Sequence, residues 1–268
     1  MDTMRQINNK GNEVKRALYL YGIVKTANAP NDGFTVPGFE GKSLSLTSYR
    51  DLSVVISDVD GVRAQANRAN LLCHTLVLEH IMQIQQVLPI RFGVVATSEE
   101  DIVNNVLKAN YWHFNELLEK LDDKKELGLK VICDQQMLLK EIVESDDKIQ
   151  KIRDSLVGRS EESTYHERIT LGRMVEAALT LRRTQIKNEI LATMAVCSEE
   201  YRENRLLTEP MILNAAFLVS VDREPEFDKR LNELSDRYEN MLTFKYTAVA
   251  PPYNFVNLVI NATTQVQS

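Results

Sequence analysis

Residues 214–248 read NAAFLVSVDREPEFDKRLNELSDRYENMLTFKYTA, and this stretch decides the fold class. The apolar run Ala215–Val221 predicts a buried strand. Pro225 stands at the start of a predicted helix, and Met241–Ala248 predicts the closing strand. Apolar residues recur along the helix at helical spacing. We therefore expect a strand–helix–strand unit that buries together Phe217, Phe227, Leu231, Leu234 and Phe244.

In the second half of the sequence, a predicted strand and three predicted helices precede this strand–helix–strand unit. Leu127–Cys133 predicts a first strand. Helices are expected near Gln135–Glu144, from Asp146 to Val157, and over Thr164–Tyr201. This order predicts a ferredoxin-like split βαβ sheet with a long helical insertion. Such a sheet has few strands and open edges.

The first half also mixes strands and helices. Four strands are predicted, at Ala17–Val24, Ser43–Tyr49, Leu52–Ser57 and Leu88–Val95, and Arg50-Asp51 forms a tight turn between the second and third. A helix is predicted over Asn70–Val87, another is capped by Ser98, and a third carries Trp112. Neither half alternates strand and helix regularly, so the predicted fold class is α+β.

A chain of 268 residues is long for one compact domain, which favours two. The polar run of residues 122–126 marks the expected boundary. We predict four parts in order: a flexible N-terminus at 1–15, an N-terminal α+β domain at 16–123, a C-terminal modified ferredoxin-like domain with the helical insertion at 124–249, and a C-terminal tail at 250–268.

The amino-acid composition argues for some classes of protein and against others. With 44% hydrophobic residues the chain can bury a core, and a net charge of -6 argues against nucleic acid as a partner. Cys73, Cys133 and Cys197 are far apart and form no metal-ligand pair, so we expect three buried thiols in a reducing cytosol. The N-terminus lacks a signal-peptide pattern, and no run of about 18 apolar residues predicts a membrane span.

The usual catalytic motifs are missing from the sequence. It has no phosphate-binding loop, dinucleotide fingerprint or nucleophile elbow. His74, Glu79 and His80 are the best constellation, but the two histidines do not share a helix face. We expect one to pack on the sheet and the other to lie on the surface. Arg91 is expected to pair with a carboxylate such as Glu79, with anion binding as the alternative. We therefore expect no catalytic residue, no metal ligand and no cofactor.

The C-terminal stretch FKYTAVAPPYNFVNL, residues 244–258, is rich in aromatic residues and interrupted by prolines. Two interpretations stay open. Either Tyr253 and Phe255 tuck into the core, or the segment is an exposed docking strip for an apolar partner. On the second interpretation, the partner-binding residues are Tyr246, Pro251, Pro252, Tyr253 and Phe255.

Six segments, taken in order, resemble the gas vesicle protein F/L family. They are ALYLYGIV at 17–24, DLSVVISDV at 51–59, HTLVLEH at 74–80, VLPIRFG at 87–93, FLVSV at 217–221 and, most strongly, LTFKYTAVAPPYNFVNL at 242–258. The family's usual glycine, proline and tryptophan before the proline pair are absent here. The ordered set covers nearly the whole chain.

This resemblance implies a gas vesicle accessory protein without enzymatic activity. It implies an assembly factor or minor vesicle component, cytoplasmic or on the gas vesicle. The expected partners are the small hydrophobic gas vesicle shell protein and other accessory proteins, with no nucleic acid and no membrane. Open sheet edges or an aromatic strip would cap the shell subunit and limit its aggregation during nucleation.

Two alternatives come from other functional classes. The first is a ferredoxin-like small-ligand or regulatory binding module, which requires a concave pocket with converging polar groups. The second is an enzyme that uses His74, Glu79 and Arg91, which requires these side chains to converge in a cleft.

Overall fold

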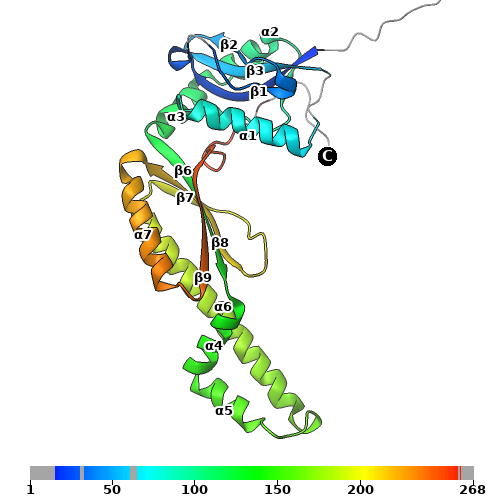
Figure 1. The fold of residues 1–268 in the computed structure, drawn as a ribbon, viewed down its shortest axis with the longest axis vertical. Coiled ribbons are helices and arrows are strands. Elements are labelled where there is room, and N and C mark those ends of the chain that lie inside the picture. The colour runs from blue at the N-terminus through cyan, green and yellow to red at the C-terminus, as the bar shows by residue number, and fades with distance from the viewer. Residues whose placement is uncertain (1–15, 31–32, 61–64, 259, 261–268) are drawn as a thin grey trace, which may run out of the picture. The chain divides into compact units, whose positions relative to one another are not determined.

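The computed structural model describes residues 16–30, 33–60, 65–258 and 260 (Figure 1). The chain divides into two compact units. The first unit contains the described residues up to Asp122 together with those from Pro251 onward, and the second unit is Asp123–Ala250. Each unit has an antiparallel sheet and helices, which confirms the α+β fold class. The predicted flexible N-terminus, 1–15, and the end of the predicted tail, 261–268, lie outside the described residues.

Strand β1 (Arg16–Lys25) is the centre of the first unit's sheet. It pairs antiparallel with β3 (Leu52–Asp60) on one side. On the other side it pairs with two short strands, β4 (Leu88–Pro89) and β5 (Val95–Ala96). β2 (Ser45–Tyr49) extends the sheet beyond β3. The turn between β2 and β3 falls at Arg50 and Asp51, as predicted.

The segment Leu88–Val95, predicted as one strand, is a strand only at its two ends. Between β4 and β5 the backbone leaves the sheet at Gly93, which has a φ of 92°. The N–H of Gly93 donates to the hydroxyl of Tyr19 at 3.0 Å instead of to a strand. Glycine tolerates this left-handed conformation, so the chain bends out and returns to β1.

Close packing explains why a glycine, Gly22, stands in the middle of β1. A Cβ atom at this position would lie 2.5 Å from Cγ2 of Val87 and 3.1 Å from the carbonyl oxygen of Leu88. The register of β1 against β3 shifts between Leu20 and Gly22. The missing side chain therefore lets the β4 segment approach the strand closely.

Helix α1 (Arg68–Met82) packs on this sheet through one face. Asn67 caps it, accepting a hydrogen bond from the N–H of Asn70 at 2.8 Å. The helix ends at Met82 and not at the predicted Val87, because Val87 is buried and Leu88 already pairs with Ile23 of β1.

Three helical segments complete the first unit. Ser98 caps α2 (Glu99–Asp101), as predicted, by accepting from the N–H of Asp101 at 3.1 Å. The π-helical segment η3 (Ile102–Lys108) and helix α3 (Tyr111–Leu121) follow.

Short 3₁₀ turns occur in both units. They are η1 (Thr26–Asn28), η2 (Phe39–Gly41), η4 (Glu162–Thr164) and η5 (Val221–Arg223).

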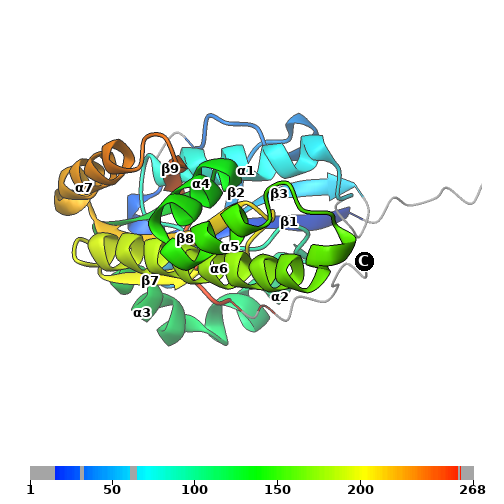
Figure 2. The same ribbon diagram turned by 90° about the horizontal axis from the view of Figure 1, so that it is seen from below.

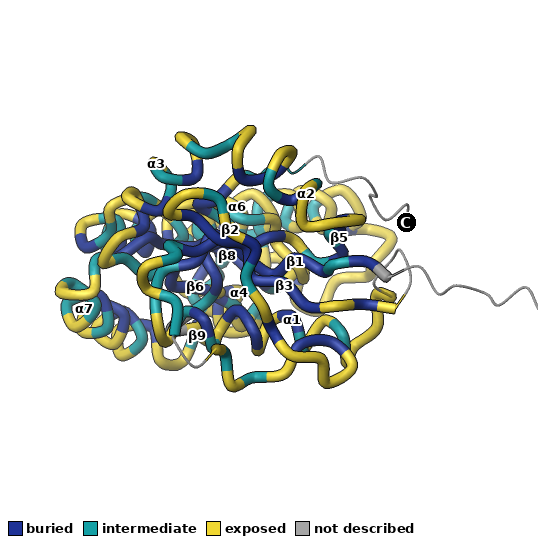
Figure 3. The backbone as a smooth tube through the Cα atoms, turned by 90° about the horizontal axis from the view of Figure 1, so that it is seen from above, coloured by how far each residue is buried: buried dark blue, intermediate teal, exposed yellow. Residues whose placement is uncertain are grey.

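The second unit contains a four-stranded antiparallel sheet in the order β7-β8-β6-β9. The two central strands are β6 (Lys124–Cys133) and β8 (Met211–Ser220). β8 is buried along almost its whole length, and Figure 3 colours buried parts of the backbone dark blue. The edges are β7 (Glu200–Glu203) and β9 (Leu242–Ala250).

Strand β7 replaces the end of the long helix predicted over Thr164–Tyr201. The helix, α6 (Tyr165–Ala195), stops earlier, and Glu200–Glu203 pairs with β8. The sequence EYRE has no strand pattern of its own. Its strand conformation comes from the main-chain partners that the edge of β8 offers.

Helices α4 (Gln135–Ser145) and α5 (Asp147–Ser155) pack against α6, and the three helices lie together in Figure 2. Asp134 and Asp146 cap α4 and α5, each accepting two main-chain hydrogen bonds. Helix α7 (Glu224–Arg237) begins with Pro225 in its first turn, as predicted.

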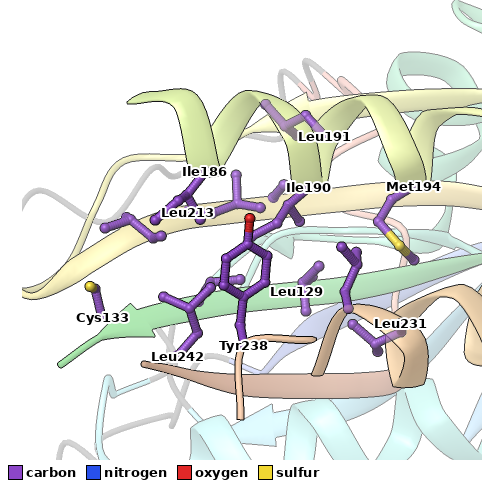
Figure 4. Close-up of a cluster of buried hydrophobic side chains, with 14 of the residues drawn as sticks. Leu129, Cys133, Ile186, Ile190, Leu191, Met194, Leu213, Leu231, Tyr238 and Leu242 are labelled. Atoms are coloured by element: carbon purple, nitrogen blue, oxygen red, sulfur yellow. The ribbon is translucent and has the colours of Figure 1, made fainter. Parts of the chain in front are cut away.

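The core of the second unit joins one face of its sheet to α6 and α7 (Figure 4). The close-up shows Ile190 and Met194 of α6 and Leu231 of α7 around strand residues such as Leu129. The predicted cluster is confirmed for four of its members, which are the buried Phe217, Phe227, Leu231 and Leu234. Phe244 packs at the border of this core and is only partly buried.

All three cysteines are free thiols. Cys133 and Cys197 are buried as predicted, whereas Cys73 is half-buried. Within the described ranges, no group of three or more histidine, cysteine, aspartate or glutamate side chains is placed to hold a metal ion. Among the described helices, none has both the length and the apolar character that a membrane crossing requires.

Candidate functional site

The C-terminal segment after β9 returns to the first unit. Pro251, Pro252 and Phe255 are buried, whereas Tyr253 is 38% exposed. Two tight turns shape the segment, in which the N–H of Tyr253 donates to the carbonyl of Pro251 at 2.7 Å and the N–H of Phe255 donates to that of Pro252 at 3.1 Å. Most of the predicted docking strip after β9 is therefore buried, and Tyr253 is its exposed member.

Tyr253 ends a hydrogen-bonded chain that runs through His74 to the central strand. Its hydroxyl lies 2.9 Å from Nε2 of His74 and 3.3 Å from the carbonyl oxygen of Ile90. Nδ1 of His74 lies 2.9 Å from the hydroxyl of Tyr19. The Tyr19 oxygen in turn accepts from the N–H of Gly93 at 3.0 Å. The chain links α1, β1, the loop before β5 and the C-terminal segment.

The hydrogen-bond pattern assigns the tautomer of His74. Nε2 lies 3.1 Å from the carbonyl oxygen of Ile90, which can only accept, so Nε2 carries the proton. Nδ1 is then an acceptor and receives the proton of the Tyr19 hydroxyl. Every polar atom of the ring has a partner with His74 neutral, so the arrangement needs no charge.

The ionisation of these groups agrees with a structural role. Burial lowers the pKa of His74 to about 4, against a smaller opposing effect of its hydrogen bond to Ile90. Burial also raises the pKa of Tyr253 to about 12 and raises that of Tyr19 further. At neutral pH all three groups are therefore uncharged.

Aromatic rings surround His74. The Tyr21 ring stacks on it at a centroid distance of 5.7 Å, and the Tyr19 and Phe92 rings contact it edge-on. The Tyr21 hydroxyl accepts from the N–H of Phe39 and bonds Ser57, each at 3.0 Å. His74 is thus the expected histidine packed on the sheet.

The candidate enzyme constellation does not converge. Glu79 and Arg91 are both exposed, and no ion pair joins them among the described residues. The expected internal pairing of Arg91 is therefore wrong, because Arg91 lies where the chain leaves the sheet. His80 is partly exposed, with Nε2 3.3 Å from Oγ1 of Thr35. It is the expected histidine outside the core.

Tyr246, the fifth predicted partner-binding residue, belongs to the second unit. It lies on the edge strand β9 and is partly buried, with its ring stacked on Phe227 at 6.0 Å. Burial raises its pKa, and the Asp228 carboxylate adds to this effect. The structure therefore divides the predicted strip between an open strand in one unit and a docked segment in the other.

Two hollows lie on helix surfaces. One is lined by parts of α4, α5 and α6, including Ile142, Asp146 and Arg182. Another lies at the start of α1 and is lined by Leu71, Leu72 and Thr75. Leu71 and Leu72 are about half exposed, so this stretch of α1 is an apolar surface that the sequence reasoning missed. The positions of Leu71 and Leu72 relative to the buried face of α1 would have identified this surface.

The His74–Tyr253 contact was also missed by sequence reasoning. Its two residues are 179 positions apart, and neither periodicity nor a local motif links them. The available signal in the sequence was a histidine, His74, within the apolar face of a predicted helix, which indicates a buried polar group in need of a partner.

Comparison with known proteins supplies the context for this geometry. Residues 17–257 match the model of a family described as "Gas vesicle synthesis protein GvpL/GvpF". A gas vesicle protein F from Microcystis aeruginosa is 28% identical over 244 residues, covering 90% of this chain and 98% of that protein. Gas vesicle protein F1 from Halobacterium salinarum is 25% identical over 251 residues, covering 92% and 96%.

Solved structures agree with the sequence relatives. The crystal structure of the gas vesicle protein GvpF from Anabaena sp. PCC7120 matches with a TM-score of 0.79 at 27% identity, covering 91% of this chain and 99% of that chain. The GvpF crystal structure from Microcystis aeruginosa matches with a TM-score of 0.73, also at 27% identity, covering 90% and 99%. Because the family match takes in nearly every described element of both units, this chain belongs to the gas vesicle synthesis protein GvpL/GvpF family.

Proposed function

We propose that this protein is an assembly factor or minor component of gas vesicles that binds the small hydrophobic shell protein and limits its aggregation during nucleation. The observation that carries the proposal is the family match over residues 17–257, which extends through both units. The family's description names the synthesis of gas vesicles and no chemical reaction. We place the protein in the cytoplasm during assembly and at the gas vesicle thereafter.

The physical reason for such a factor lies in the subunit that it would bind. A small shell protein with an apolar face aggregates unless that face is covered before incorporation. A binding protein that covers it reversibly keeps the subunit available to a growing nucleus. Other accessory proteins of the vesicle are the further partners that we propose.

The predicted binding residues divide into two groups under this proposal. Tyr253 is exposed and Tyr246 is partly buried, and these two residues would contact the partner. Pro251, Pro252 and Phe255 are buried and would act by holding the turn that presents Tyr253. Aromatic rings of this kind supply much of the binding energy in protein interfaces.

We also propose that the second unit is a ferredoxin-like fold with a helical insertion. Two features support this classification. The strands follow the antiparallel order β7-β8-β6-β9, and α4–α6 stand between β6 and β7 where a simple split βαβ unit has one helix. We also propose the domain division predicted from the sequence, 16–123 and 124–249, which fragments 16–122 and 123–250 test to within one residue at each boundary.

A binding titration tests the function. The full-length protein is titrated with the shell protein, kept soluble as fragments, at low and high salt. Apolar contact predicts an affinity that changes little with salt, because only exposed charge pairs are strongly screened. A pull-down from vesicle-forming cells, with the shell protein as readout, is the second measurement. Absence of binding in both experiments would refute the proposal.

One double variant tests whether the C-terminal strip, and not another part of the surface, binds the partner. The double variant Tyr253→Ala, Phe255→Ala weakens binding if the strip contacts the partner. Phe255 is buried, so folding of the variant has to be checked by circular dichroism. Unchanged affinity in a folded double variant would exclude the strip and leave the shell-protein proposal itself standing.

A further inference from the structure

The two edges of the second unit's sheet differ in length and in charge. β7 has four residues, of which Glu200, Arg202 and Glu203 are charged. Arg202 pairs with Glu200 at 2.5 Å, and Glu203 pairs with Lys187 of α6 at 3.0 Å. A short and charged edge of this kind resists the addition of another strand.

The opposite edge, β9, is longer and carries less charge. It has nine residues, LTFKYTAVA, and its single charge is Lys245. Its regular part, Leu242–Thr247, offers an edge of about 20 Å at about 3.3 Å per residue. Within the part of the chain that the structure describes, β9 pairs with β6 alone. Lys245 and the register shift beyond Thr247 are the protective features of this edge, and between Leu242 and Thr247 the pairing with β6 is regular.

The ladder shows which main-chain groups of β9 face outward. The N–H of Asp134, at the end of β6, donates to the carbonyl of Met241 at 2.8 Å, so Met241 faces β6. Because hydrogen bonding alternates along an antiparallel pair, Leu242, Phe244 and Tyr246 turn their N–H and C=O groups away from β6. The N–H of Leu242 agrees with this direction, since it bonds Tyr238 and not β6.

The side chains of β9 define what can pair there. Phe244 and Tyr246 lie on the face that packs on the core, and both are only partly buried. Thr243, Lys245 and Thr247 lie on the other face and are exposed. A strand added beside β9 would cover the open flanks of the two aromatic rings with its own alternate side chains. The edge therefore fits an extended segment that is apolar at every second residue and carries no positive charge.

We propose that β9 binds an extended segment of the small hydrophobic shell protein by strand addition, as a fifth strand of the second unit's sheet. This inference rests on the proposed function for the identity of the partner. Main-chain hydrogen bonds supply the affinity, and Phe244 and Tyr246 favour apolar alternate side chains. Pairing with β9 also occupies one edge of the shell segment, which stops that edge from adding further copies.

A peptide experiment tests the main-chain contact. Short overlapping peptides of the shell protein are labelled and titrated with the full-length protein, and the best binder is made in two N-methylated forms. One form is methylated at odd positions and the other at even positions, so each loses the N–H groups on one edge. Strand addition predicts that one form loses at least about tenfold in affinity while the other binds nearly as well as the unmodified peptide. Equal binding of the two forms would overturn the proposal.

Matched protein variants test the same contact from the other side. Tyr246→Pro and Tyr246→Ala both remove the ring, but only the proline removes the outward N–H. We expect Tyr246→Pro to bind about tenfold more weakly than Tyr246→Ala. The control pair is Tyr201→Pro and Tyr201→Ala on β7, where Asn204 donates to the carbonyl of Asn214 and the N–H of Tyr201 therefore faces outward as well. This control pair should show no such difference.

The outcomes separate the two proposals. If neither the shell protein nor any of its peptides binds, the proposed function fails, and the strand-addition site fails with it. If the shell protein binds but the methylated peptides and the Tyr246 pair show no difference, only the β9 site is refuted. If Tyr246→Pro fails to fold, the peptide comparison alone decides. Self-association of the protein that Tyr246→Pro abolishes would assign β9 to a second copy and overturn the proposal.

Discussion

At the scale of single residues, the buried His74 makes the first unit sensitive to acid. The pKa of His74 is lowered to about 4, mainly by burial, from 6.5 in the unfolded chain. Between these values the unfolded state binds more protons than the native state, so stability rises with pH and is lost as the pH falls from about 6.5 to about 4. We expect His74 to account for a loss of about 3 kcal/mol over this range.

Urea unfolding of the wild type and of His74→Gln from pH 7 to pH 4 checks this expectation. Circular dichroism follows the unfolding. His74→Gln should lose markedly less stability on acidification than the wild type, although it starts from a lower value. His80→Gln, on the same helix, is the matched control. Parallel pH profiles for the wild type and His74→Gln would contradict the assignment.

The hydroxyl of Tyr253 gives a second prediction at this scale. Tyr253→Phe removes the bonds to His74 and to the carbonyl of Ile90 while leaving the ring in place. We expect a loss of about 0.5–1.5 kcal/mol in the free energy of unfolding, the usual contribution of such hydrogen bonds. Tyr165→Phe, at a ring that is 61% exposed, serves as the control. An unchanged unfolding midpoint for Tyr253→Phe would show that the C-terminal segment is not held by this bond.

At the scale of elements, α7 and the strands around it depend on Phe227. This side chain is fully buried, contacts Phe217 at a centroid distance of 5.4 Å and stacks on Tyr246. Phe227→Ala leaves a cavity between helix and sheet and should cost about 3–5 kcal/mol. Lys229→Ala, on the exposed face of the same helix, should stay within about 0.5 kcal/mol. Chemical denaturation followed by circular dichroism measures both, and a cost below about 1 kcal/mol for Phe227→Ala would mean that the core is wrongly assigned.

At the scale of the whole molecule, the two units differ in chain continuity. The second unit is one segment, Asp123–Ala250, whose core cluster lies entirely within it. The first unit is completed by residues from Pro251 onward, including the buried Phe255 and Val256. We therefore expect fragment 123–250 to unfold cooperatively alone. Fragment 16–122 should be less stable than the same unit in the full chain, because it lacks the Tyr253 bonds and two buried apolar side chains.

Adding a peptide of residues 251–260 provides the decisive comparison. The peptide should raise the unfolding midpoint of fragment 16–122, since a ligand that binds only the native state stabilises it. The same peptide with Tyr253 replaced by Phe should do so less effectively. A fragment 16–122 that equals the full chain in stability, with or without peptide, would show that the C-terminal segment contributes nothing to this unit.

The sequence by itself determined the α+β class, most of the elements and the family. Ala17–Val24, the Arg50-Asp51 turn and the helix at Pro225 follow from local periodicity and turn chemistry, which act over a few residues. The packing of Phe227 with Leu231 and Leu234 follows from the same helical spacing. The family resemblance depended on the order of short segments along the chain, which a sequence displays directly.

Only the tertiary structure decided the rest. β7 is a strand because the edge of β8 supplies its main-chain partners, and Leu88–Val95 is interrupted because Gly93 bonds the hydroxyl of Tyr19. The Tyr253–His74 bond and the burial of Phe255 join residues from opposite ends of the chain. The open edge of β9 likewise depends on which strands take the central places in the sheet. These features arise from contacts between distant segments, whose free energy is set by the folded arrangement and not by any local pattern of residues.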